Sequence, residues 1–189
     1  MNDNIKSILN SIIPLSESAI KKVQEITQII HLSKGTIITQ TGNNNNLEYF
    51  VLRGVCKSCL NNVDGEEITL SFFMPNTVIS PFTTRSKEGK SILNIKCLTD
   101  VEIATMDAHK FETLMIEDEE IRIFGNTVLR NELMDKVQKE IGLASLPSKN
   151  RLQILRKKYP NIENLVAHTD IASYLGITPI SLSRLRSKI

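Results

Sequence analysis

The stretch of residues 168–189 constrains the fold more than any other part of this sequence. Thr169 or Asp170 is placed to cap a helix over residues 171–175, because side-chain oxygens of these residue types accept hydrogen bonds from the first free backbone N–H groups of a helix. Gly176 then supplies the positive φ that a sharp turn needs. We therefore expect a short helix that ends in a tight turn.

A second helix is expected immediately after this turn. Thr178-Pro179 is typical of a helix start, since threonine caps and proline fits the first turn, where its missing N–H costs nothing. Ile177 would fill the angle between the two helices, and Ala172 is small where they approach each other. Apolar residues then recur at helical spacing on one face: Leu182, Leu185 and Ile189. The pattern predicts a helix-turn-helix.

The opposite face of the second helix carries hydroxyl and basic side chains, with no acid after Asp170. Arginine can donate two parallel hydrogen bonds to a guanine edge, while serine and lysine can hold phosphates. A helical hairpin with a merely solvated basic face is the alternative, but the cap, the turn glycine and the apolar face together favour DNA binding. We expect Arg184 to contact a base, Ser181 a base or a phosphate, and the others mainly phosphates. The full set of expected DNA-binding residues is Thr178, Ser181, Ser183, Arg184, Arg186 and Lys188.

The charge of the chain is divided unevenly. Residues from Ser145 onward hold eight basic and two acidic side chains, a net charge of +6, and the remainder holds 15 basic and 19 acidic ones, a net charge of −4. An acidic body with a basic C-terminal module indicates contact with a polyanion, although a solvated basic face would give the same count. No apolar run reaches membrane-spanning length, the first residues lack the pattern of a signal peptide, and three cysteines cannot all pair. We therefore expect a cytoplasmic protein that does not bind a membrane.

The middle of the chain has the pattern of short β-strands. Residues 5–30 show helical spacing on either side of Pro14, but after Gly35 runs rich in β-branched and aromatic residues alternate with turn residues. These runs cover residues 36–40, 48–60, 66–74, 91–98 and 101–106. Asp64-Gly65 between two of them is typical of a hairpin. Strands at this spacing predict a barrel or sandwich rather than a parallel sheet.

Helical spacing returns at Asp107, which can cap a short helix, and a longer proline-free stretch runs from about residue 118 to 144. Gly125 and Asn131 interrupt its apolar stripe, which fits either a core helix packed on the β-domain or the seam of a dimer. We favour the dimer seam, because a long connecting helix has little local core to cover it. The stripe consists of Ile121, Phe124, Val128, Leu129, Leu133, Val137 and Ile141.

The sequence resembles the catabolite-activator/fumarate-nitrate-regulator (Crp/Fnr) family, in the form common among Bacteroidetes proteins. The segment IASYLGITPISLSRLRSKI resembles the family's C-terminal helix-turn-helix. Upstream, YFVLRG (49–54), DGEE (64–67) and DVEI (100–103) resemble its strand with a glycine turn, the following hairpin and the strand before the connecting helix. The resemblance covers almost the whole chain in matching order.

This resemblance implies an α+β fold in three parts. Residues 1–117 would form a cyclic-nucleotide-binding-type, jelly-roll-like β-roll with N-terminal helices. Residues 118–144 would form a dimerisation helix, and residues 145–189 a winged-helix-like helix-turn-helix domain that binds double-stranded DNA. A two-fold dimer would place the two recognition helices about 34 Å apart on a roughly palindromic operator. RNA polymerase and an unidentified small-molecule effector are further candidate partners.

The family's phosphate-binding cassette is degenerate in this sequence. The family has a Gly-Glu pair, whose carboxylate takes a ribose hydroxyl, and then an Arg-Ser/Thr-Ala group, whose arginine forks onto the phosphate. Here the first falls on Ser80-Pro81, without a carboxylate, and the second on Lys90-Ser91-Ile92, without the fork. We expect no cyclic nucleotide, and either an unidentified effector or none. The weak candidates for ligand binding are Ser80, Arg85 in the intervening loop, Lys90 and Ser91.

The remaining reactive side chains indicate no catalytic or metal site. Cys56 and Cys59 form a CxxC, but Cys97 is the only other thiol. Their odd spacing along a strand would send them to opposite faces, so we expect one buried and one exposed structural cysteine. The histidines are scattered, and no nucleophile–base pair, glycine-rich phosphate loop or carboxylate pair is found. We therefore expect no metal, no cofactor and no enzymatic activity.

The interpretation is a homodimeric transcription regulator that reads DNA through residues 178–189. Family members of this kind often carry an acid where Ile180 stands, and losing that acceptor for cytosine should change the preferred sequence. The alternative is a sensor or protein-interaction module of the same fold that does not read DNA, which the degenerate cassette would suit.

Overall fold

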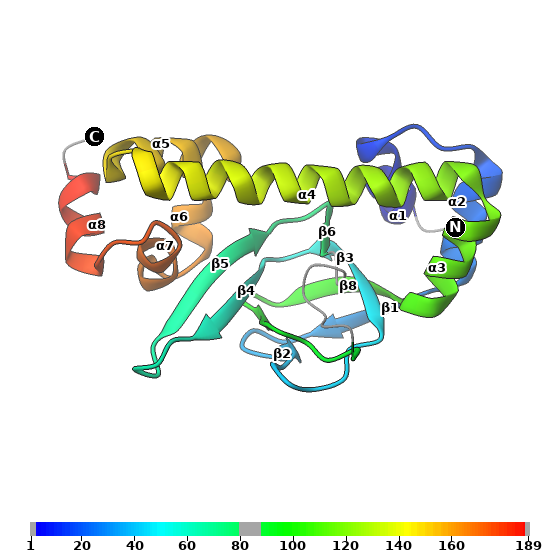
Figure 1. Ribbon diagram of the computed structural model, residues 1–189, viewed down its shortest axis with the longest axis horizontal. Helices are drawn as coiled ribbons and strands as arrows, with labels where there is room; N and C mark the ends of the chain where they lie inside the picture. Colours follow the sequence, from blue (N-terminus) through cyan, green and yellow to red (C-terminus); the bar gives the residue numbers. More distant parts are fainter. Residues whose placement is uncertain (1–2, 80–87, 188–189) are drawn as a thin grey trace.

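The computed structural model describes residues 3–79 and 88–187, and this part of the chain has a mixed α+β architecture. Figure 1 shows a β-domain of two sheets, a long helix α4 that runs across the molecule, and a group of short helices at the C-terminal end. The expected order of β-roll, long helix and helix-turn-helix is confirmed. None of the described helices has both the length and the apolar character to cross a membrane.

Two helices, α1 (Asp3–Ile12) and α2 (Glu17–Glu25), precede the first strand. The prediction of a helix up to residue 30 is wrong at its C-terminal end. The chain forms strand β1 (Thr27–Leu32) there, which pairs antiparallel with β8 (Val101–Asp107). The apolar residues at positions 26, 29 and 30 fit both a helix and a strand. The pairing with β8, a partner distant in sequence, decides between the two.

Two four-stranded sheets face each other, in the orders β1-β8-β3-β6 and β2-β7-β4-β5. Side chains of β3 alternate between two cores: Tyr49 and Val51 pack between the sheets, whereas Phe50 and Leu52 pack against the helices. The prediction of a barrel or sandwich rather than a parallel sheet is confirmed, and β1 and β6 are strands that the pattern missed. The remaining strands are β2 (Ile37–Thr39), β3 (Leu47–Arg53), β4 (Cys56–Asn61), β5 (Glu67–Phe73), β6 (Thr77–Ile79) and β7 (Asn94–Cys97).

The run predicted over residues 48–60 is two strands rather than one, because the chain turns at Gly54. Gly54 has a φ of +82°, and a Cβ atom there would lie 2.2 Å from the carbonyl oxygen of Asp100. Only glycine fits this position, since it has no Cβ and tolerates positive φ. The turn places β3 and β4 in different sheets and so helps to close the sandwich.

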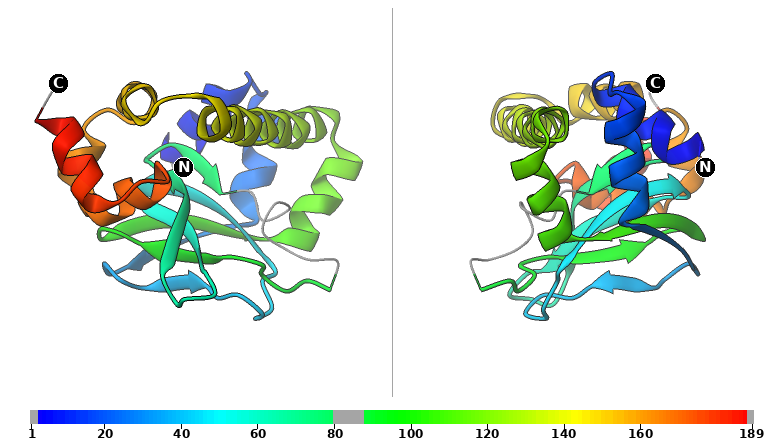
Figure 2. Two further views of the ribbon diagram at one scale, coloured as in Figure 1. Left: turned by 60° about the vertical axis from the view of Figure 1, so that its left-hand side comes forward. Right: turned by 90° about the vertical axis from the view of Figure 1, so that its right-hand side faces the viewer.

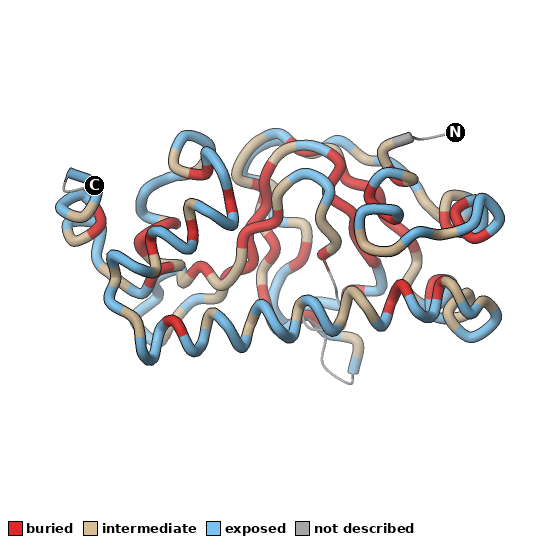
Figure 3. Tube along the Cα trace, turned by 90° about the horizontal axis from the view of Figure 1, so that it is seen from above, coloured by how far each residue is buried: buried red, intermediate tan, exposed pale blue. Residues whose placement is uncertain are grey.

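Helices α3 (Ala108–Glu117) and α4 (Glu119–Ser145) follow the last strand. Asp107 caps α3 as expected, by accepting a hydrogen bond from the Lys110 N–H (2.9 Å), and Asp118 caps α4. In its first half α4 buries Ile121 and Phe124 in a core that also includes α1 and α2. Figure 2 shows α4 almost end-on above the sheets, and Figure 3 shows how much of its second half is exposed.

The C-terminal module consists of α5 (Ser148–Lys158), α6 (Ile162–Leu165), α7 (His168–Tyr174) and α8 (Pro179–Arg186). Its described residues, 146–187, contain no β-strand. Phe72 of β5 also belongs to its apolar core, which the module therefore shares with the β-domain. The other buried members are Leu152, Leu155, Tyr159, Ile162, Ile171, Ala172, Leu175 and Leu182.

Candidate nucleic-acid interface

The turn between α7 and α8 has the geometry that the sequence predicts. Gly176 has a φ of +64°, and the N–H of Ile177 donates to the carbonyl of Ala172 (3.0 Å). Thr178 caps α8 by accepting a hydrogen bond from the Ser181 N–H (3.1 Å), and Pro179 occupies the first turn. The side chain of Ile177 packs against the core of the module. The second helix therefore leaves the turn in a fixed direction.

The predicted cap of the first helix is wrong. Helix α7 begins at His168, and its N-cap residue, Ala167, makes no side-chain hydrogen bond. Asp170 lies in the first turn of α7, where its carboxylate accepts a hydrogen bond from Nζ of Lys57 (2.6 Å) in the β-domain. The carboxylate of Asp170 is thus bonded to Lys57, which is distant in sequence, rather than to the backbone at the start of α7.

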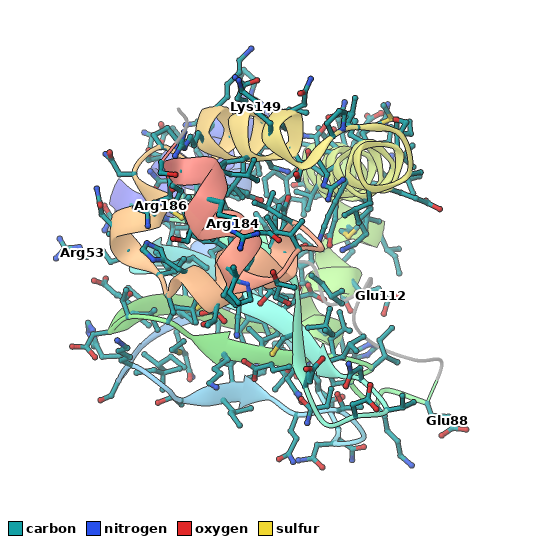
Figure 4. The ribbon with its side chains drawn as sticks, turned by 90° about the vertical axis from the view of Figure 1, so that its left-hand side faces the viewer. Arg53, Glu88, Glu112, Lys149, Arg184 and Arg186 are labelled. Carbon is teal, nitrogen blue, oxygen red and sulfur yellow. The ribbon has the colours of Figure 1, made fainter. Side chains whose placement is uncertain are left out.

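Helix α8 packs through its leucines and presents its polar side chains to solvent. Leu182 is buried and Leu185 packs partly against the same core, whereas Ser183 and Arg184 are exposed. The hydroxyl of Ser181 is half-buried next to the cap and accepts a hydrogen bond from Thr178 Oγ1 (3.0 Å). Figure 4 shows Arg184 on α8 at the end of the molecule that faces the viewer. Arg184 is therefore well placed to reach a partner.

Arg186 is held in an ion-pair network that the sequence did not indicate. Its Nε lies 2.9 Å from Glu163 of α6, whose carboxylate also accepts a hydrogen bond from Nε of Arg156 (2.6 Å). Arg186 also donates to the ring of His168 (2.8 Å to Nε2). The hydrogen bond from Arg156 lowers the pKa of Glu163. Arg186 therefore ties α8 to α6, while its side chain stays partly exposed.

Two basic residues outside the predicted set lie in the same module. Lys149 is exposed near the start of α5 and stands at the top of the view in Figure 4. Arg151 donates to the carbonyls of Leu175 (3.0 Å) and Leu146 (2.6 Å), so it braces the end of α7 against the end of α4. Lys188, the last predicted contact, lies outside the described residues.

A buried lysine fastens the module to the β-domain. Lys57 of β4 is 1% exposed, and its Nζ hydrogen-bonds to both Glu67 and Asp170. Burial disfavours the charged form, but these two carboxylates outweigh it and raise the pKa of Lys57. Beside this contact the N–H of Thr69 donates to Oγ of Ser173 in α7 (2.9 Å). Both helices of the helix-turn-helix are thus positioned relative to the sheet through α7.

Aromatic rings extend the same contact. The ring of Phe72 in β5 lies 6.0 Å from that of Tyr159 and 5.2 Å from that of Tyr174, between ring centres. Burial raises the pKa of Tyr159 to about 12 and also raises that of Tyr174, so both phenols stay neutral. The joint between the two parts combines one charged cluster with one apolar cluster.

A groove of about 810 Å³ lies between the second half of α4 and strands β5 and β6. Nζ of Lys139 in α4 donates to the carbonyl of Leu70 (2.6 Å) and lies 3.9 Å from the centre of the Tyr174 ring. Burial, together with the charges of Lys136 and Lys158, lowers the pKa of Lys139 to about 8. The groove therefore touches α4, the β-domain and α7 at once.

Two of the four weak candidates for ligand binding, Lys90 and Ser91, lie in the described part of the chain. Lys90 is exposed and lies 3.8 Å from Glu88 in an ion pair. Ser91 is buried, and its hydroxyl donates to the carbonyl of Leu93 (2.6 Å). Ser80 and Arg85, the other two candidates, lie outside the described residues.

The cysteines differ from the expectation of one buried and one exposed thiol. Cys56 points into the core between the sheets, directly opposite Cys97 in the pairing of β4 with β7. Cys59 is also buried, and its neighbours include Glu67 and Lys57, on the side of the sheet that faces α7. The prediction of exposure was wrong because the C-terminal module covers that face. In the part of the chain that the structure describes, no three His, Cys, Asp or Glu side chains cluster as metal ligands would.

Comparisons with known proteins agree with this architecture. Residues 29–118 match the family described as the cyclic nucleotide-binding domain. None of the curated proteins matches the chain. FixK2 from Bradyrhizobium japonicum superposes with a TM-score of 0.75 at 16% identity, covering 86% of this chain and 84% of that one.

Two further structures have the same arrangement. The c-di-GMP responsive global regulator CLP from Xanthomonas campestris has a TM-score of 0.73 at 15% identity, covering 92% of this chain and 91% of that one. A transcriptional regulator of the crp/fnr family from Eubacterium rectale has a TM-score of 0.68 at 19% identity, covering 94% and 87%. CLP and the protein from Eubacterium rectale are described as regulators, and at these identities the likeness shows a shared fold.

Proposed function

We propose, on the premise that residues 29–118 belong to the cyclic nucleotide-binding domain family and that the chain has the crp/fnr regulator fold, that this protein is a DNA-binding transcription regulator. The observation that carries the proposal is the presentation of α8. This helix is capped by Thr178, packed through Leu182 and open to solvent at Arg184. Such a helix can enter the major groove with its apolar face still covered.

The roles of the polar residues follow from their contacts. Arg184 is the base-reading residue, because its guanidinium is exposed and can donate two parallel hydrogen bonds to guanine. Ser183 and Lys149 suit phosphate contacts, since both are exposed on the same module. Arg186 acts mainly by positioning α8 through Glu163. Thr178 and Ser181 form the cap of α8, and in the proposed complex this cap lies next to the DNA backbone.

A homodimer is the second part of the proposal. Beyond residue 128, α4 exposes apolar side chains of the predicted stripe, among them Leu133, Val137 and Ile141. Exposed apolar residues at this spacing on a 27-residue helix suit a pairing with the same helix of a second copy. The two-fold axis would then present two α8 helices to two half-sites of a roughly palindromic operator.

Control by an effector is the third part. The groove beside Lys139 touches α4, the β-domain and α7, so a bound molecule there would favour one placement of the module over another. The groove suits this task better than the degenerate cassette, whose Ser91 hydroxyl is committed to a backbone carbonyl. We expect an effector other than a cyclic nucleotide bound in the usual cassette.

Salt-dependent binding to duplex DNA tests the function. The purified protein is mixed with a random pool of duplexes, and affinity for the selected sequence is measured from about 50 to 200 mM salt. A reader of DNA should lose affinity steeply, with a slope of about −0.9 per neutralised phosphate. The absence of any salt-dependent binding would favour the alternative, a sensor or interaction module of this fold that does not read DNA.

A further inference from the structure

Ile180 is a large apolar side chain in solvent at the start of α8. Its side chain is 66% exposed, whereas Leu182 in the same helix is 1% exposed. Ile180 follows Pro179 as the second residue of α8. A single exposed apolar residue is ordinary on a protein surface. The place of this one on the recognition helix, rather than its exposure alone, carries the inference.

Ile180 lies on the same face of α8 as Arg184. Residues four positions apart in a helix stand one above the other, about 6 Å apart along the axis. Successive bases on one DNA strand are about 3.4 Å apart, so two such side chains reach bases about two steps apart. The N-terminal residues of a recognition helix are the ones that contact base edges. Wherever Arg184 reaches a guanine, Ile180 therefore faces a base nearby.

The chemistry of Ile180 selects among the four bases. Its side chain has no donor and no acceptor, so it cannot pair with the edges of guanine, adenine or cytosine. The 5-methyl group of thymine is the one apolar group that the major groove offers. No acidic residue lies on α8 to compete for cytosine. Polar edges facing Ile180 would lose water without gaining a hydrogen bond.

We propose that Ile180 is a specificity-determining residue that reads the 5-methyl group of a thymine within about two base pairs of the guanine read by Arg184. This inference rests on the proposed function and names the sequence that the proposed site prefers. The contact buries one methyl group against the isoleucine side chain. Burial of a group of this size corresponds to about a four-fold change in affinity for each half-site.

The experiment removes one methyl group at a time from the DNA. In the duplex selected by the wild-type protein, each thymine in turn is replaced by deoxyuridine, which pairs in the same way but lacks the 5-methyl group. We expect one sensitive thymine in each half-site, near the base pair at which Arg184→Ala no longer discriminates between bases. Replacing that thymine should weaken wild-type binding about four-fold. Replacement of both should weaken binding about fifteen-fold.

Two variants separate a direct contact from a general effect. Ile180→Ala should bind the thymine and deoxyuridine duplexes equally. Ile116→Ala, which truncates another exposed isoleucine near the end of α3, should keep the four-fold difference. As a gain of contact, 5-methylcytosine placed at the same position should bind wild-type protein more tightly than cytosine does.

The outcomes are distinguishable. If wild-type protein binds duplex DNA with salt dependence but no deoxyuridine replacement weakens binding, the reading of thymine by Ile180 is wrong and the proposed function stands. The same conclusion follows if Ile180→Ala keeps the full deoxyuridine effect. If the wild-type protein binds no duplex at all, the proposed function is wrong, and the reading of thymine by Ile180 is wrong with it.

Discussion

The two ends of this molecule differ in how completely each retains the groups that its proposed task needs. At the C-terminal end the cap, the turn and the exposed Arg184 are all in place on one helical pair. At the cassette, Lys90 pairs with a neighbouring acid and the Ser91 hydroxyl is bonded to a backbone carbonyl. On this comparison we propose that any signal acts through a site other than the usual cassette of the β-roll.

The joint between these ends is where a signal would have to act. Lys57 and Phe72 belong to the β-domain, yet both also contact side chains of the C-terminal module. A ligand that strengthens or weakens this joint would change the orientation of α8 without touching it.

Lys57→Met should have the largest effect among the variants of this joint. It leaves the carboxylates of Glu67 and Asp170 without their shared buried cation, which should cost about 1–3 kcal/mol of stability. The loss should appear in urea unfolding and as faster amide exchange in α7. Lys96→Met is the matched control, because Lys96 pairs with the same Glu67 at 3.5 Å but is half-exposed. Equal losses in both variants would show that Lys57 does not fasten the module.

Glu163→Gln should have a smaller effect that depends on pH. The folded-state pKa of Glu163 lies below its ordinary value of 4.5, so its ion pairs stabilise the fold above about pH 4.5 and are lost as the pH falls through the folded pKa. The variant should be less stable than wild type at pH 7, by up to about 1 kcal/mol, and the gap should close toward pH 3. Unfolding curves across this range measure it. A gap that stays constant with pH would contradict an ionic role.

Lys90→Ala should have the smallest effect, within about 0.5 kcal/mol in stability, because its ion pair with Glu88 is exposed. Cyclic AMP or cyclic GMP should leave the melting temperature of both wild type and variant unchanged. A cyclic nucleotide that stabilises wild type but not Lys90→Ala would show that the cassette functions, and the contrast between the two ends would disappear.

Much of this architecture was predictable because its signals are local. The turn glycine at 176, the cap at Thr178 and the cap at Asp107 each depend on residues within a few positions of one another. Most of the helices and strands likewise follow from periodicity, although β1 and β6 do not. Local chemistry of this kind does not need knowledge of the tertiary fold.

The features that escaped prediction depend on partners distant in sequence. Asp170, or Thr169 before it, was expected to cap α7, but Asp170 is bonded to Lys57, more than a hundred residues upstream. One of Cys56 and Cys59 was expected at an open face, but the C-terminal module covers the face on which Cys59 lies. The ion pair of Arg186 with Glu163 of α6 was not predicted either. No local pattern distinguishes a side chain that is free from one claimed by another part of the chain.

The most direct measurement of the central claim is base discrimination by Arg184. Binding to every single-base variant of the selected duplex is compared for wild type, Arg184→Ala and Arg122→Ala. Arg122→Ala is the control, because Arg122 is exposed near the start of α4, at the end away from α8. The account predicts that Arg184→Ala loses about 1–3 kcal/mol of discrimination at one base pair of each half-site, while Arg122→Ala retains it. Unchanged discrimination in Arg184→Ala would contradict the reading of DNA through α8.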